Sequence, residues 1–156
     1  MQSLSKLLTR AIEITSVGIM VIMSLMVFIN VVLRYALNSS IVSSEELSRF
    51  LFVWLTFLSA ILAYQEKSHI CVDFIVKKLG RWAIRWFGVI SNILIAFCCM
   101  MIVNGSCQLT QIGLVEASPV TEIPMATLYI SGIIGGTGIF IISVIRVFFG
   151  LVGKEV

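Results

Sequence analysis

Few residues in this chain could carry out chemistry. The single histidine, His69, precedes Asp73 by four residues, so the two side chains would share a face if the segment were helical, but no nucleophile accompanies them. One histidine cannot supply both ligands of a bis-histidine haem, and the four cysteines show no CxxC or Cys/His metal spacing. The sequence has no HExxH motif and no glycine-rich phosphate loop. We therefore predict a protein that is not an enzyme and holds no metal or cofactor.

A second group of polar residues, Glu45, Glu46 and Arg49, lies just before an apolar run of 16 uncharged residues, 50–65. Ser43 followed by Glu46 has the spacing of a capping box, which predicts that a helix starts at Ser43. A transmembrane helix needs about 20 residues, so this run can cross a bilayer only if the helix includes its charged flank.

The composition of the chain predicts the kind of fold that contains these residues. Of the 156 residues, 59% are hydrophobic and only 12% are charged, whereas soluble domains carry about 25% charged residues. The apolar runs are unbroken, unlike the short alternating segments of β-barrels, and therefore predict an all-α integral membrane protein. We expect a single membrane domain, 1–156, with four transmembrane helices at about 12–34, 44–65, 87–115 and 123–146.

The distribution of basic residues predicts the orientation. With four spans, both ends of the chain and the loop between the second and third spans share one side. That side holds nine of the eleven basic residues: Lys6, Arg10, Lys67, Lys77, Lys78, Arg81, Arg85, Arg146 and Lys154. The positive-inside rule then places the N and C termini in the cytoplasm. The net charge of +3 does not by itself point to a partner, and we expect no nucleic acid.

The loop between the second and third spans has the pattern of an amphipathic interfacial helix at about 72–86, which Gly80 could interrupt. Tryptophan and basic residues suit an anionic membrane surface, where each Lys or Arg contributes about 1 kcal/mol. A solvated connector is the alternative. We assign six residues to lipid anchoring: Lys77, Lys78, Arg81, Trp82, Arg85 and Trp86.

The second span has two different faces. Bulky residues form one stripe: Phe50, Trp54, Phe57 and Ile61. Small residues form the other: Thr56, Ser59, Ala60 and Ala63. We favour lipid contact for the aromatic side chains and packing inside the chain for the small ones, because small residues let helices approach closely. In the alternative, both faces contact protein, one of them from another chain.

Polar residues and glycines mark the other spans. Asn30 and Arg34 share a face near the end of the first span, where Arg34 either extends to the headgroups beside a tolerated asparagine or both residues make a tertiary contact. Gly132 and Gly136 form a GxxxG pair, which predicts a close helix crossing. Three amides share a face of the third span and are predicted to pack inside the bundle rather than line a wet pore: Asn104, Gln108 and Gln111.

The chain lacks what a self-sufficient transporter needs. No carboxylate lies near the middle of any span, and no inverted repeat or pair of broken spans is evident. We therefore expect the chain to hold another protein in place. The alternatives are an independent small channel or exporter that works as a homo-oligomer, and a subunit of a membrane redox enzyme, which the lone histidine disfavours.

The segment 34–76 resembles the core of the DctQ-type family, the small membrane subunits of tripartite ATP-independent periplasmic (TRAP) transporters. The matching positions are Arg34-Tyr35, Glu45-Glu46, Arg49, Phe52, Trp54, Phe57, Ala60, His69 and Val72-Asp73, followed later by Ser118-Pro119 and Ile123-Pro124. The likeness extends to about residue 135. Two departures are Ser59, where members usually have glycine, and Val120-Thr121-Glu122. Ser59 is expected to loosen one close packing point without affecting membership.

The resemblance implies a multi-pass protein of the bacterial inner membrane that works in a sodium-coupled importer. In such transporters a large permease subunit carries the substrate and sodium sites and moves in an elevator fashion. A periplasmic binding protein delivers the substrate, a carboxylate such as a C4-dicarboxylate or sialic acid, and overall likeness favours the sialic acid branch. The small subunit is expected to brace and orient the permease as a heterodimer. The implied partners are therefore the large permease, the binding protein and phospholipids.

The matching positions and helix faces define a predicted partner interface of ten residues: Arg34, Glu45, Glu46, Arg49, Trp54, Phe57, Ser59, Ala60, His69 and Asp73. Within it we hypothesise an outer polar cluster, made of the two arginines and two glutamates of this set. The cluster would orient the first two spans against the permease or its docking protein.

Overall fold

The structure, a computed structural model, describes residues 2–37, 39, 41–66 and 81–152. They form four α-helices: α1 (Gln2–Leu37), α2 (Val42–Gln65), α4 (Arg81–Gly113) and α5 (Ala126–Val152). Each helix contains a segment that is long and apolar enough to cross a membrane. The predicted all-α class with four transmembrane helices is therefore confirmed.

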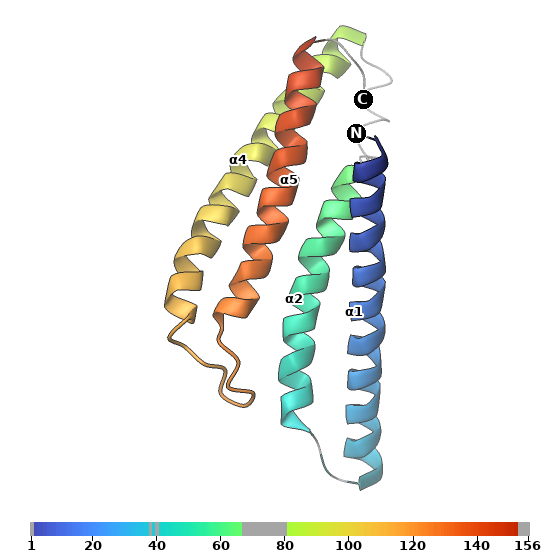
Figure 1. The fold of residues 1–156 in the computed structure, drawn as a ribbon, viewed down its shortest axis with the longest axis vertical. Helices are drawn as coiled ribbons and strands as arrows, with labels where there is room; N and C mark the ends of the chain where they lie inside the picture. Colours follow the sequence, from blue (N-terminus) through green and yellow to red (C-terminus); the bar gives the residue numbers. More distant parts are fainter. Residues whose placement is uncertain (1, 38, 40, 67–80, 153–156) are drawn as a thin grey trace.

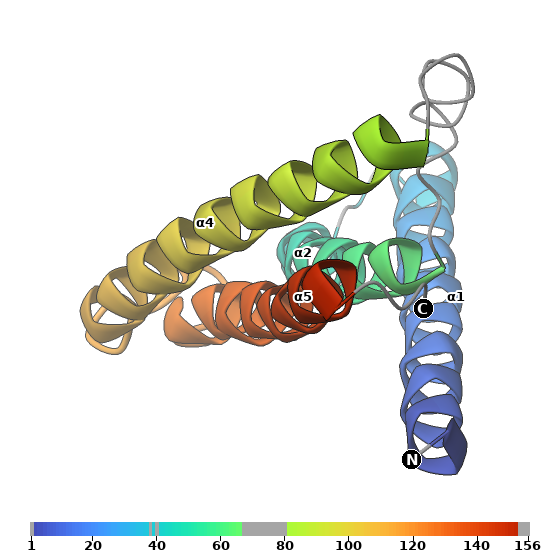
Figure 2. The ribbon, with the colours of Figure 1, turned by 90° about the horizontal axis from the view of Figure 1, so that it is seen from above.

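The helices stand in a row rather than in a closed bundle (Figure 1). α1 packs on α2, α2 packs on α5, and α5 packs on α4, so α1 and α4 occupy the two edges. Figure 2 shows the same order from above. α1 starts and α5 ends at one end of the row, which we call the terminal end; the α1–α2 and α4–α5 connections lie at the opposite, loop end. The predicted orientation places the terminal end on the cytoplasmic side.

α5 can pack against two neighbours because glycines line two of its sides. A Cβ atom added at Gly136 would lie 2.8 Å from Cγ2 of Val103 in α4, and one added at Gly132 would lie 2.5 Å from Oγ of Ser106 in the same helix. A Cβ atom added at Gly135 would lie 2.7 Å from Cβ of Phe57 in α2. The close crossing predicted from the GxxxG pair is confirmed for α4, and Gly135 provides a second one with α2.

The bulky stripe of α2 packs inside the chain. Phe50 and Ile61 are buried, and Phe57 lies against α5. On the small-residue stripe, Thr56 and Ala63 are exposed. The favoured assignment of the two faces is therefore wrong for these residues. The glycines that permit close packing come from α5, so the bulky side chains of α2 fill the space between the two helices.

The start of α2 also differs from the prediction. The helix begins at Val42 with Ile41 as its N-cap residue, and no side chain of that residue caps it. Instead, the Ile41 N–H donates a hydrogen bond to Oδ1 of Asn30 in α1 at 2.9 Å. The capping box between Ser43 and Glu46 does not define the start, because the Glu46 carboxylate is held by another part of the chain.

α4 exposes the face that was predicted to be internal. It packs on α5 through a side that includes the buried Cys99 and the half-buried Val103. Its three amides are exposed in the chain: Asn104, Gln108 and Gln111. The prediction that they pack inside the bundle is wrong, because α4 stands at the edge of the row and has only one neighbouring side to fill.

The predicted interfacial helix falls mostly outside the described residues. The same is true of four predicted site residues: His69, Asp73, Lys77 and Lys78. α4 begins at Arg81, so the remaining lipid-anchoring candidates belong to the first turns of this helix: Arg81, Trp82, Arg85 and Trp86. Of these, Trp86 has an exposed side chain.

Candidate functional site

Glu46 is the most firmly held of the predicted interface residues. Only 9% of its surface is exposed, although it carries a carboxylate. Oε1 accepts a hydrogen bond from the Ser118 hydroxyl, and Oε2 accepts one from the Thr121 backbone N–H at 2.8 Å. Ser118 itself is 2% exposed. We call these three residues the Glu46 clasp; it ties α2 to the α4–α5 loop.

The loop that meets Glu46 has a tight turn of its own. The Ser118 N–H donates to the carbonyl of Ile123 at 2.9 Å, and the Glu122 N–H donates to the carbonyl of Ser118 at 3.1 Å. Glu122 adopts a left-handed conformation with φ of 56°, which lets the chain reverse within a few residues. The reversal directs a hydroxyl and an N–H from the same turn toward one carboxylate.

Glu45 faces the other way, toward α1. Its Oε1 accepts a hydrogen bond from Nδ2 of Asn30 at 3.3 Å, and the neighbouring Ser44 hydroxyl donates to the Met26 carbonyl at 3.4 Å. Asn30 is buried, and its hydrogen bond to Glu45 is a tertiary contact, which was one of the two alternatives for this residue in the sequence analysis. A cavity of about 140 Å³ beside this contact is lined by Val27, Asn30, Val31, Arg34, Ser44, Glu45 and Ser48.

The outer polar cluster is only partly assembled in the isolated chain. Arg34 lines the same cavity as Glu45, whereas Glu46 is turned toward the α4–α5 loop. Arg34 and Arg49 are both exposed, and neither forms an ion pair with another described residue. Both guanidinium groups therefore remain accessible to a partner at the loop end.

The other described interface candidates lie along α2. Phe57 is in contact with α5, as described above, while Trp54, Ser59 and Ala60 are half-buried. None of them is available as a fully exposed surface in the chain. A partner that packs against α2 would therefore contact only the part of these side chains that remains exposed.

At the terminal end, Asn92 of α4 connects three helices. Its Oδ1 accepts a hydrogen bond from the Tyr64 hydroxyl of α2 at 2.5 Å. Its backbone carbonyl accepts one from the Ser143 hydroxyl of α5 at 2.6 Å. Its Nδ2 donates to the Gly88 carbonyl one turn earlier at 2.7 Å. Both ends of this amide are therefore satisfied within the chain.

A second set of contacts at the same end brings in α1. The Arg146 guanidinium donates to the Gln65 carbonyl at 3.1 Å and lies 4.6 Å from the centre of the Tyr64 ring. The Thr9 hydroxyl donates to Oε1 of Gln65 at 3.0 Å. Together with Asn92 and Ser143, these residues form what we call the terminal network. Sequence reasoning missed it; the available signal was polar side chains at the ends of apolar runs.

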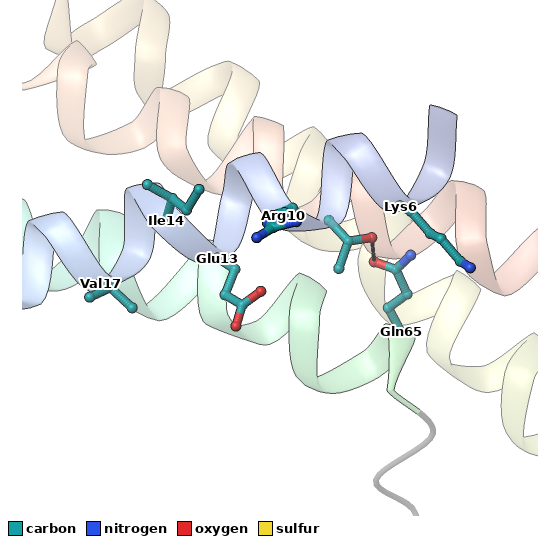
Figure 3. Close-up of a pocket in the computed structure, with 7 residues that line it drawn as sticks. Lys6, Arg10, Glu13, Ile14, Val17 and Gln65 are labelled. Carbon is teal, nitrogen blue, oxygen red and sulfur yellow. Dashed lines mark hydrogen bonds between the residues drawn. The ribbon is translucent and has the colours of Figure 1, made fainter. Parts of the chain in front are cut away.

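A groove of about 670 Å³ opens beside the terminal network, between α1 and the end of α2 (Figure 3). Its lining combines charged, polar and apolar side chains: Lys6, Thr9, Arg10, Glu13, Ile14, Val17 and Gln65. Charges of both signs next to apolar side chains can contact a polar group and a hydrocarbon chain together. Among the described residues, no three His, Cys, Asp or Glu side chains are grouped to hold a metal ion.

Comparison with known proteins agrees with the four-helix layout. The family model of the DctQ component of tripartite ATP-independent periplasmic transporters matches residues 23–153. A TRAP transporter small permease protein of Haemophilus influenzae is 37% identical over 146 residues, which cover 94% of this chain and 91% of the relative. A second protein of that name and organism is 33% identical over 139 residues, covering 89% and 84%.

These matches cover most of the chain and of both relatives. A protein with four membrane-spanning helices and this family match is a transport component of the bacterial inner membrane and not an enzyme. The chain belongs to the DctQ family, the small membrane subunits of TRAP transporters.

Proposed function

We propose that this chain is the scaffold subunit that braces and orients the large permease of a sodium-coupled carboxylate importer. Membership of the DctQ family supports the assembly with a large permease and a periplasmic binding protein. The structural observation that carries the bracing role is that the row of helices is fastened at both ends. The Glu46 clasp joins α2 to the α4–α5 loop, and the terminal network joins all four helices at the opposite end.

A brace must keep its shape while its partner moves. Helices in a bilayer gain little from hydrophobic association with one another, so their arrangement depends on close packing and interhelical hydrogen bonds. In this chain the glycines of α5 supply the close packing, and the two ends supply the hydrogen bonds. This combination supports a rigid role rather than a moving one.

The edges of the row offer surface for a large partner. Phe28 on α1 and Phe97 on α4 are both more than half exposed, and they belong to two long apolar helices that each have one principal helix neighbour in the chain. A permease that packs on such an edge would be held at a fixed tilt. The substrate we propose is a carboxylate, sialic acid or a C4-dicarboxylate, delivered by the periplasmic binding protein.

Reconstitution tests this proposal. The large permease in proteoliposomes, supplied with the binding protein and a sodium gradient, should take up labelled substrate only when this chain is present. The chain alone should move nothing. Sodium-driven uptake by the permease without the chain would contradict the bracing role. Solute movement by the chain alone would favour an independent homo-oligomeric channel or exporter.

We also propose that the basic and tryptophan residues just before α4 and in its first turns anchor the subunit to anionic lipid. Replacing the four cations with glutamine should reduce the anionic phospholipid that co-purifies with the complex: Lys77, Lys78, Arg81 and Arg85. The control variant replaces Lys6 and Arg10, two basic residues of the groove that are predicted to lie on the same side of the membrane. Equal lipid content in both variants would count against a specific anchoring role.

A further inference from the structure

One face of α4 carries three amides within the apolar span and has no neighbour among the described residues. Five residues follow one another at helical spacing along it: Phe97, Met101, Asn104, Gln108 and Gln111. All five are exposed. The side of α4 that carries Cys99 and Val103 packs on α5, and the five residues lie on the opposite side of the helix.

The three amides on this face make no hydrogen bond to any described residue. This is unlike the other two asparagines of the described helices, because Asn30 and Asn92 both use their side-chain oxygen and nitrogen within the chain. An amide without a partner is disfavoured in hydrocarbon, where no water replaces the missing hydrogen bonds.

Asn104 lies inside the apolar span of α4. The membrane-spanning part of α4 ends at Gly113, beside Ala126, where the span of α5 begins. Asn104 precedes Gly113 by nine residues, about 14 Å along the helix. Gln108 and Gln111 are closer to the end and have longer side chains, but the short side chain of Asn104 cannot extend that far. A polar group from another protein at the same depth would satisfy its amide.

We propose that this α4 face is the docking surface for the large permease subunit, and that a permease helix presents hydrogen-bonding groups to Asn104 and Gln108. The inference rests on the proposed function and specifies which edge of the row meets the partner. Phe97 and Met101 extend the same face with apolar contact toward the terminal end. The groups that face Asn104 belong to the permease, so the isolated chain leaves the amide unsatisfied.

Site-specific photo-crosslinking in the co-expressed complex tests the face. A benzophenone amino acid placed at Asn104 or Gln108 should form a crosslink to the large permease. The matched control is Leu109, which is exposed on the same helix but points about 100° away from Gln108. Crosslinks from the first two positions and none from Leu109 are expected. A crosslink to a second copy of this chain, or to lipid alone, would overturn the proposal.

A double substitution provides an independent readout. N104L with Q108L should lower the permease recovered with the tagged chain on the order of tenfold, because two membrane hydrogen bonds are lost. L109M, which lies off this face, should leave recovery unchanged, and the thermal stability of the isolated chain should not fall in any variant. Unchanged recovery in the double variant would refute the α4 assignment while leaving the bracing role intact. If the wild-type chain recovers no permease, the proposed function itself fails.

Discussion

Asn92 and Asn104 lie twelve residues apart on α4 and have opposite surroundings. Asn92 faces the row, where its amide accepts from Tyr64 and donates to the Gly88 carbonyl, while its backbone accepts from Ser143. Asn104 points away from the row and makes no hydrogen bond to a described residue. The same residue type in the same helix therefore serves the fold at one end and is left for a partner at the other.

The comparison separates two kinds of polar residue in a membrane helix. Those of the first kind, which include Glu46 and Asn92, are satisfied within the chain and fasten its helices together. Those of the second kind, which include Asn104 and Arg49, are exposed. Substituting the first kind should destabilise the chain, and substituting the second should affect only the assembly.

The largest effect is expected at Glu46. Glu46→Ala removes a nearly buried carboxylate and leaves the Ser118 hydroxyl and the Thr121 N–H without their acceptor. Losing charge-assisted hydrogen bonds in a buried site should lower the free energy of unfolding by about 2–3 kcal/mol. Thermal unfolding of the purified chain in detergent measures the change. Glu45→Ala is the control, because Glu45 is exposed and makes one long contact; equal losses in both variants would refute the distinction.

Gly135 and Gly105 give the corresponding comparison for packing. A Cβ atom at Gly135 would lie 2.7 Å from Cβ of Phe57, whereas one at Gly105 in α4 would meet nothing within 4 Å. Gly135→Ala should force α2 and α5 apart and destabilise the chain by about 2 kcal/mol. Gly105→Ala should be neutral or slightly stabilising, since alanine favours the helix. A stability loss for Gly105→Ala as large as for Gly135→Ala would show that the face of α4 at Gly105 is covered within the chain.

Asn92→Leu should have a smaller effect. It removes the acceptor of the Tyr64 hydroxyl, and interhelical hydrogen bonds in membrane proteins contribute about 1 kcal/mol or less. Thermal unfolding should show a modest decrease, and hydrogen exchange should increase at the terminal ends of α2 and α4. Ser143→Ala, which removes only the bond to the Asn92 backbone, should fall between this variant and wild type. An unchanged melting temperature for Asn92→Leu would mean that the terminal network does not fasten the row.

The sequence predicted the class of fold well because bilayer thickness imposes the length of each apolar run. It also predicted the GxxxG crossing, since two glycines one turn apart let a neighbouring helix approach closely. It failed on which helix faces which. The two stripes of α2 were assigned in reverse for Phe50 and Thr56, because a helix pattern shows that two faces differ but not what the neighbouring helix supplies.

Part of the candidate site was also predictable from the sequence. Glu45, Glu46 and Arg49 were identified from their types and their position beside a span. The partners of Glu46 were not predicted, because Ser118 and Thr121 are more than 70 residues away and reach Glu46 only through the fold of the α4–α5 loop. The terminal network was missed because Tyr64, Asn92 and Arg146 lie on three helices whose adjacency no local pattern encodes.

The smallest effect on the chain itself is expected at Asn104. Asn104→Leu removes an amide that makes no hydrogen bond to a described residue and replaces it with a side chain suited to lipid, so the isolated chain should unfold at the wild-type temperature or slightly above it. Asn92→Leu is the paired control on the same helix. Thermal unfolding of both variants in one detergent compares the two positions directly. If Asn104→Leu destabilised the isolated chain as much as Asn92→Leu, the amide would have a partner inside the chain, and the division between fastening and docking residues would not hold for α4.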